Sequence, residues 1–198
     1  MIVLPSARMS NRYFVVLAAL LLSFPVNAQH ISVGTNLLQW ANLGTINAEF
    51  SYAPARHITI TAAVRFNNWQ FDTKQEHLIV QNKQKTASLG IRYWPWYVYS
   101  GWWFGVRGQY KDFSASGIWR PALNTGTSVG ASISTGYTIL LHERLNLDFG
   151  IGAWGGRMLK HTLYECPLCL DIRERGPKWF VGFDEISVSL IYIFGKNR

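Results

Sequence analysis

The 198-residue sequence contains no apolar run long enough for a membrane-spanning helix. The run at 13–22 has about ten residues, whereas a spanning helix needs roughly 20. A basic helix is absent as well, and the positive charge is scattered along the chain. A helical membrane anchor and a nucleic-acid-binding surface are therefore not expected.

The N-terminus has the features of a secretory signal peptide. Arg8 and Arg12 precede the short apolar run, and small residues at Val26 and Ala28 follow it. We expect residues 1–28 to be removed, leaving 29–198 as one domain. No cysteine follows the expected cleavage site, which excludes a lipoprotein anchor there. A buried hydrophobic helix is the alternative interpretation of this segment.

The rest of the chain alternates apolar and polar residues with period two, and no helical periodicity competes with it. In 58–67, for example, Ile60 and Val64 alternate with Thr61 and Arg65. This pattern predicts β-strands near 31–38, 46–52, 58–67, 86–93, 102–110, 128–137, 145–152 and 186–194. Eight strands in one domain indicate an all-β barrel.

The polar face favours a barrel that is polar inside and apolar outside. This face is rich in Ser, Thr and Gly and poor in Lys, unlike a soluble exterior. Its mid-strand charges could balance one another inside a narrow lumen. The proposed lumen charge cluster comprises Glu49, Arg65, Arg92, Arg107 and Asp148. Pairing within the barrel is the structural interpretation of these charges, and a proton or substrate relay is the alternative.

Aromatic residues and connection lengths agree with a membrane barrel. Aromatics gather near the strand ends, as in interfacial girdles. The connections alternate in length, with long loops expected at 68–85, 112–124 and 155–183. With both termini periplasmic, every long loop would be extracellular. The expected girdle residues are Trp40, Tyr52, Trp69, Tyr93, Trp94, Trp96, Tyr97, Tyr99, Trp102 and Tyr192.

The fold that we expect is an eight-stranded antiparallel transmembrane β-barrel, following a cleaved signal peptide. It would be a monomer in outer-membrane lipid. Its interior would be filled by side chains, so a conducting pore is not expected. A soluble lipocalin-like barrel is the alternative fold, and it would act as a carrier.

Both cysteines lie in one C-x-x-C motif, Cys166 and Cys169, in the longest connection. A loop disulfide suits an oxidising exterior. A zinc site would need more ligands, with His161 the nearest candidate. A redox pair would need a βαβ context that is absent here. A loop clip is the interpretation that we favour.

Other motifs do not indicate an enzyme. Gly150, Gly152 and Gly155 fit G-x-G-x-x-G, but they lie on a predicted strand and not between a strand and a helix. They more simply make room in a narrow lumen. No histidine lies mid-strand beside a serine and an acid. We therefore predict no catalytic residues, no cofactor and no metal site.

Four aromatic residues in the predicted loops are candidates for a surface-binding patch: Trp69, Phe71, Trp119 and Trp179. Packing within the loops or in a girdle is the alternative role for them.

Several segments together resemble a family of small Bacteroidales proteins, domain of unknown function 3575. They are Thr35–Leu38 with Trp40, Ile91–Trp94, Tyr164-x-Cys166-x-x-Cys169 and Ser189–Phe194. The resemblance implies an outer-membrane barrel, often encoded near fimbrial assembly genes, with no catalytic residues to carry over. The ending departs from an outer-membrane signature that stops on an aromatic residue, because Gly195–Arg198 follow Phe194 here.

The function that we expect is a non-enzymatic structural or surface-interaction role, with a surface or fimbrial protein as the partner. An accessory role in fimbria assembly or anchoring is the alternative, and it rests on the resemblance alone. An enzyme acting on envelope lipid or glycan is a third possibility.

Overall fold

The computed structural model describes residues 31–42, 44–73, 78–116, 122–165 and 172–194. The predicted signal peptide, 1–28, lies outside these residues. No helix in the described part of the chain is long and apolar enough to cross a membrane.

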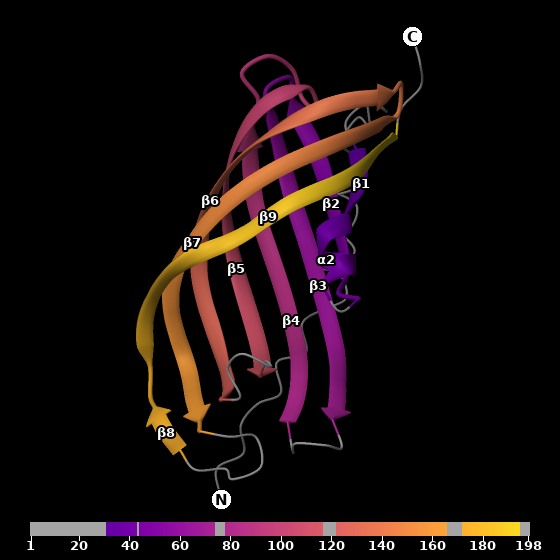
Figure 1. The fold of residues 1–198 in the computed structure, drawn as a ribbon. Helices are drawn as coiled ribbons and strands as arrows, with labels where there is room; N and C mark the ends of the chain where they lie inside the picture. Colours follow the sequence, from indigo (N-terminus) through magenta and orange to yellow (C-terminus); the bar gives the residue numbers. More distant parts are fainter. Residues whose placement is uncertain (1–30, 43, 74–77, 117–121, 166–171, 195–198) are drawn as a thin grey trace, which may run out of the picture.

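The described chain forms one closed antiparallel sheet with a short helix near its beginning (Figure 1). The elements are β1 (Ile31–Asn36), α2 (Leu37–Ala41), β2 (Ile46–Ala55), β3 (Ile58–Thr73), β4 (Leu78–Tyr93), β5 (Gly101–Ser116), β6 (Leu123–His142), β7 (Leu145–Tyr164), β8 (Ile172–Arg175) and β9 (Lys178–Phe194). Each strand pairs with its neighbour in sequence up to β7. Pairing of β9 with both β7 and β1 then closes the barrel.

The barrel wall has eight strands, as predicted. The short strand β8 does not add a ninth strand to the wall, because it pairs only with the C-terminal end of β7. It lies on the same edge of β7 as β9, and Gly176 and Pro177 separate the two strands. Gly176 has a φ of 139°, a conformation that a side chain would strain.

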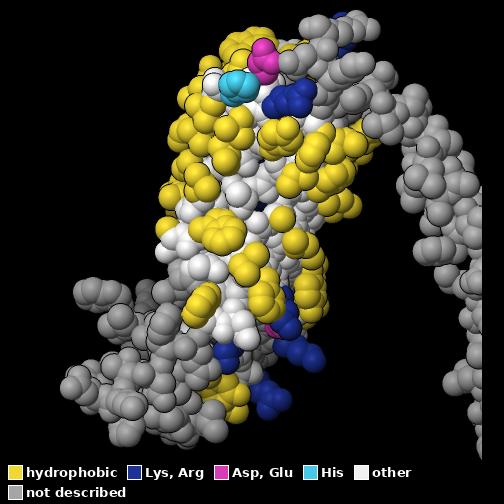
Figure 2. Space-filling model, turned by 90° about the vertical axis from the view of Figure 1, so that its right-hand side faces the viewer, with side chains coloured by type: hydrophobic (Ala, Val, Ile, Leu, Met, Phe, Trp, Pro, Cys, Tyr) yellow, Lys and Arg dark blue, Asp and Glu magenta, His cyan; other side chains and the backbone are white. Residues whose placement is uncertain are grey.

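The wall is apolar outside and polar inside. Successive residues of a strand face opposite sides. On β6, Ile133 is 68% exposed whereas Ser132 is 1% exposed, and on β4 Leu89 is 63% exposed whereas Arg92 is 8% exposed. Figure 2 shows hydrophobic side chains over the middle of one face, with charged side chains toward the two ends. This polarity is the one predicted for a membrane barrel and the reverse of a lipocalin-like interior.

The helix α2 was not predicted. The first strand was expected to continue to Leu38, but it ends at Asn36. The Asn36 side chain accepts a hydrogen bond from the Leu38 N–H at 3.0 Å, which caps the helix. Continuing the strand would have turned the large apolar side chains of Leu38 and Trp40 toward the polar interior.

The prediction of long loops was wrong. The segments 68–85, 112–124 and 155–183 consist mostly of paired strands. Their sequences mix polar and aromatic residues on both faces, so the period-two pattern weakens although backbone pairing continues. At this end of the barrel the protein presents extended hairpins, joined by connections at 74–77, 117–122 and 165–171.

Candidate functional site

An ion-pair layer crosses the barrel interior. Arg92 on β4 lies between carboxylates from two distant strands, Glu49 on β2 and Asp148 on β7. Its Nη2 lies 2.7 Å from Glu49 Oε1 and its Nη1 lies 3.6 Å from Asp148 Oδ2. The Arg92 guanidinium thus links β4 to both β2 and β7 across the barrel interior.

Asp148 is held by two further donors. Trp103 Nε1 and Thr138 Oγ1 each donate a hydrogen bond to Asp148 Oδ1, both at 2.6 Å. The Asp148 side chain is only 1% exposed, so these contacts and Arg92 replace the water that an ionised carboxylate would require. Such a satisfied, buried carboxylate suits a structural role better than a reactive one.

Aromatic side chains close the barrel next to this layer. Trp94 and Trp103 are 0% and 1% exposed, and their rings lie 6.3 Å apart. Tyr99 packs on Trp94 at 5.8 Å, and its hydroxyl lies 3.0 Å from Ser51 Oγ. We call this group the aromatic plug: Ala53, Trp94, Val98, Tyr99 and Trp103.

The plug forms because the β4–β5 connection folds under the barrel. The Trp94 N–H donates to the His57 carbonyl at 2.8 Å, and the Val98 N–H donates to the Arg56 carbonyl at 3.0 Å. Tyr99 adopts a φ of 64°, rare for a residue with a side chain, which turns its ring inward. Trp94 and Tyr99 were predicted as girdle residues, and that prediction was wrong for both.

Two glycines make room for the plug. A Cβ on Gly136 would lie 2.5 Å from Trp103 Cζ2 and would also collide with the Phe149 carbonyl oxygen. A Cβ on Gly150 would lie 3.1 Å from Trp103 Cζ2 and 2.6 Å from Ser187 Oγ. Gly150 belongs to the G-x-G-x-x-G stretch, and its place beside the lumen agrees with the packing interpretation.

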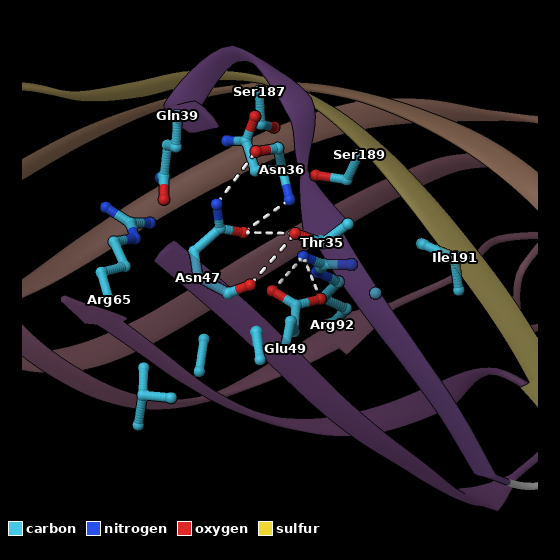
Figure 3. Close-up of a pocket in the computed structure, with 14 residues that line it drawn as sticks. Thr35, Asn36, Gln39, Asn47, Glu49, Arg65, Arg92, Ser187, Ser189 and Ile191 are labelled. Atoms are coloured by element: carbon cyan, nitrogen blue, oxygen red, sulfur yellow. Dashed lines mark hydrogen bonds and ion pairs between the residues drawn. The ribbon is translucent and has the colours of Figure 1, made fainter. Parts of the chain in front are cut away.

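A small cavity is lined by Gln39 of α2 and by Glu49 and Arg92 of the ion pair (Figure 3). Its volume is about 30 Å³, enough for one or two water molecules and far below the roughly 300 Å³ of a ligand pocket. Asn47 anchors one side, since it donates to the Asn36 carbonyl at 3.0 Å and accepts from the Asn36 N–H at 2.6 Å. The polar interior therefore offers no room for a substrate at this level.

The structure brings together three of the five predicted lumen charges: Glu49, Arg92 and Asp148. Arg65 on β3 lines the small cavity with Glu49 and Arg92. Arg107 is buried on the inner face of β5, 7% exposed.

Among the other predicted site residues, the structure describes the side chains of Trp69 and Trp179 only. Trp69 is 49% exposed on β3 and Trp179 is 78% exposed on β9, two strands that do not pair. Phe71 belongs to β3, but its side chain is not described. Trp119, Cys166 and Cys169 lie outside the described residues. In the part of the chain that is described, no three His, Cys, Asp or Glu side chains are placed to hold a metal ion.

Sequence reasoning did not single out Trp103 and Thr138. A signal was present for Trp103, because it shares the inward parity of Gly105 and Arg107 on the same strand. Thr138 carries no signal of its own, since it is one of many inward hydroxyl residues.

A family model described as "Protein of unknown function (DUF3575)" matches residues 14–194. Because this match covers most of the chain, the protein belongs to that family, as the resemblance indicated. No curated protein and no solved structure matches the chain.

Proposed function

We propose that this member of a family of unknown function is a sealed, non-enzymatic outer-membrane barrel that interacts with another macromolecule at the cell surface. The observation that supports it most is the apolar exterior around a hydrogen-bonded polar interior. In water, apolar side chains spread over the whole wall would form a patch far larger than soluble monomers tolerate. In lipid, a closed barrel pairs its main-chain groups between neighbouring strands and needs no apolar core.

The proposed barrel does not conduct. The aromatic plug fills one end, and the layer of Glu49, Arg92 and Asp148 lies directly beside it. Eight-stranded barrels are just wide enough for side chains to fill their interior.

The extended hairpins support the surface role. A strand needs about 9–11 residues to cross a bilayer, whereas β6 and β7 have 20 residues each. The surplus lies at the end opposite the plug, where Trp69 and Trp179 are exposed. The fimbrial partner that the resemblance implies stays a prediction.

Cell fractionation of the expressed full-length chain tests the membrane placement. We expect recovery in the outer membrane and migration on gels that changes on boiling, because a closed barrel resists detergent until heated. Reconstitution in a planar bilayer should give no ion conductance. Recovery as a soluble periplasmic protein would overturn the proposal, and steady conductance would overturn the sealed interior.

A further inference from the structure

The wall is uneven where its first and last strands meet. β1 pairs with β9 only over Ile31–Asn36, opposite Ser189–Phe194. Beyond this point β9 continues to Lys178, and among the described residues it pairs there with β7 alone. Figure 1 shows β9 running on past the end of β1. We call the unpaired side of Lys178–Val188 the open edge.

Two hydrogen bonds fix which main-chain groups face the open edge. The Ile193 N–H donates toward β7, to the Arg144 carbonyl at 2.9 Å, whereas the Val188 N–H donates toward β1, to Asn36 Oδ1 at 3.4 Å. The side of β9 to which the N–H and C=O groups point alternates from one residue to the next. A β-bulge between Glu185 and Phe183 shifts this alternation by one residue. The residues that direct N–H and C=O groups away from β7 are therefore Trp179, Val181, Phe183 and Ile186.

The same residues carry strongly exposed apolar side chains. Trp179, Val181 and Phe183 are 78%, 89% and 81% exposed. On β7, their paired neighbours are Arg157, Gly155 and Ala153, respectively. Arg157, beside Trp179, is thus the first charged residue on the outer face of β7. Val181, Phe183 and Ile186 consequently lie in the apolar band of the wall.

An open sheet edge in this band conflicts with a lipid environment. Lipid accommodates the apolar side chains, but it offers no hydrogen bonds to main-chain N–H and C=O groups. At the start of the edge, next to the end of β1, the Asn36 side chain accepts from the Val188 N–H. The groups beyond it require a neighbour that supplies donors and acceptors in alternation.

An extended polypeptide strand supplies this pattern, and a lipid chain does not. A second copy of the same edge is excluded by symmetry. Parallel pairing about a two-fold axis along the strand would place identical N–H and C=O groups opposite one another, whereas a parallel ladder requires staggered groups. Antiparallel pairing of two β9 edges needs a two-fold axis perpendicular to the wall, and that axis would place one barrel upside down in the membrane. The neighbour is thus a different segment that continues the ladder where β1 ends.

We propose that the open edge of β9 accepts an extended strand from another polypeptide. This inference rests on the proposed membrane placement. The added strand would satisfy the edge of β9 and cover Val181 and Phe183, with its own apolar residues facing lipid.

Photo-crosslinking in the native host tests this inference with the full-length chain. A photoreactive phenylalanine analogue is placed at Phe183 on the open edge, or at Ile133 on β6 as the control. Ile133 is similarly apolar and 68% exposed, but its strand is paired on both sides. Each is combined with Val181→Pro, which removes an edge N–H, or with Val181→Thr, which keeps it.

We expect a polypeptide adduct from Phe183 but not from Ile133. Val181→Pro should reduce it at least about fivefold, as for the loss of one hydrogen bond, while Val181→Thr retains it. Heat-modifiable migration should persist in both variants, because this N–H is not used by β7.

Other outcomes overturn the inference. A lipid adduct alone, an adduct between two copies, or no adduct at Phe183 would each do so, as would equal polypeptide yields from Phe183 and Ile133 or an adduct that Val181→Pro leaves unchanged. Failure of the unsubstituted protein to reach the outer membrane is a separate result, which would overturn the proposed function together with this inference.

Discussion

The guanidinium carbon of Arg92 lies 4.3 Å from the centre of the Trp103 ring, while the same group forms ion pairs with Glu49 and Asp148. Trp103 also donates to Asp148. The ion-pair layer and the aromatic plug are thus one connected unit, and substitutions in either should affect the stability of the whole barrel.

Replacing Arg92 with leucine should destabilise the barrel, because two carboxylates would remain without their cation. We expect a loss of about 3 kcal/mol in the free energy of unfolding, measured by urea titration in detergent. The double variant Arg92→Leu with Glu49→Leu should recover part of this loss. Equal stability of Arg92→Leu and the parent would show that the layer contributes little.

Adding one methyl group beside the plug should also destabilise the barrel. Gly136→Ala places a Cβ against Trp103 and the Phe149 carbonyl, and such overpacking costs roughly 1–3 kcal/mol. Gly182→Ala is the matched control, since nothing lies within 4 Å of its Cβ position. The temperature at which gel migration changes should fall only for Gly136→Ala, and a similar fall for both would contradict this packing.

Stability should depend on the Tyr99 phenol at high pH. Burial raises the pKa of Tyr99 above its ordinary 10.0, although its contact with Ser51 acts in the opposite direction. The folded chain therefore holds this proton more tightly than the unfolded chain. The resulting stabilisation is complete below about pH 10 and declines as the pH rises further. Tyr99→Phe should show a weaker decline in the urea midpoint, and parallel pH profiles would refute the assignment.

Asn36 should stabilise both the start of α2 and the contact between the end of β1 and β9. Asn36→Ala removes the acceptor for Leu38 and Val188, and we expect a loss of about 1 kcal/mol. Asn36→Asp keeps an acceptor oxygen and should lose less. Hydrogen exchange of the Val188 amide should accelerate in Asn36→Ala, and unchanged exchange would mean that this contact does not protect the edge.

The number of strands and the polarity of the wall could be predicted from the sequence. In a strand with one face buried, apolar and polar residues alternate with period two in any environment. Residues such as Ile133 and Ser132 carry that signal locally. The lumen position of Arg92 followed from the same parity, but its choice of Glu49 and Asp148 depends on register around a closed barrel, which no local pattern specifies.

The turns and the upper hairpins could not be predicted in this way. Trp94 and Tyr99 enter the barrel because a connection is pinned to Arg56 and His57, a tertiary event with no periodic signal. The open edge arises because β1 stops at Asn36, where the cap and the following apolar residues favour a helix. Above the apolar band, both faces meet similar surroundings, so strands there resemble loops in composition.

Site-directed spin labelling in lipid bilayers tests the central claim most directly. After Cys166→Ser and Cys169→Ser, single cysteines are placed at Leu89 and Ile133, which face outward, and at Ser88 and Ser132, which precede them on β4 and β6. If the barrel lies in lipid with a polar interior, labels at 89 and 133 should be accessible to dissolved oxygen, and labels at 88 and 132 should be shielded from it. The reverse order, or protein that remains in the aqueous phase, would contradict the account.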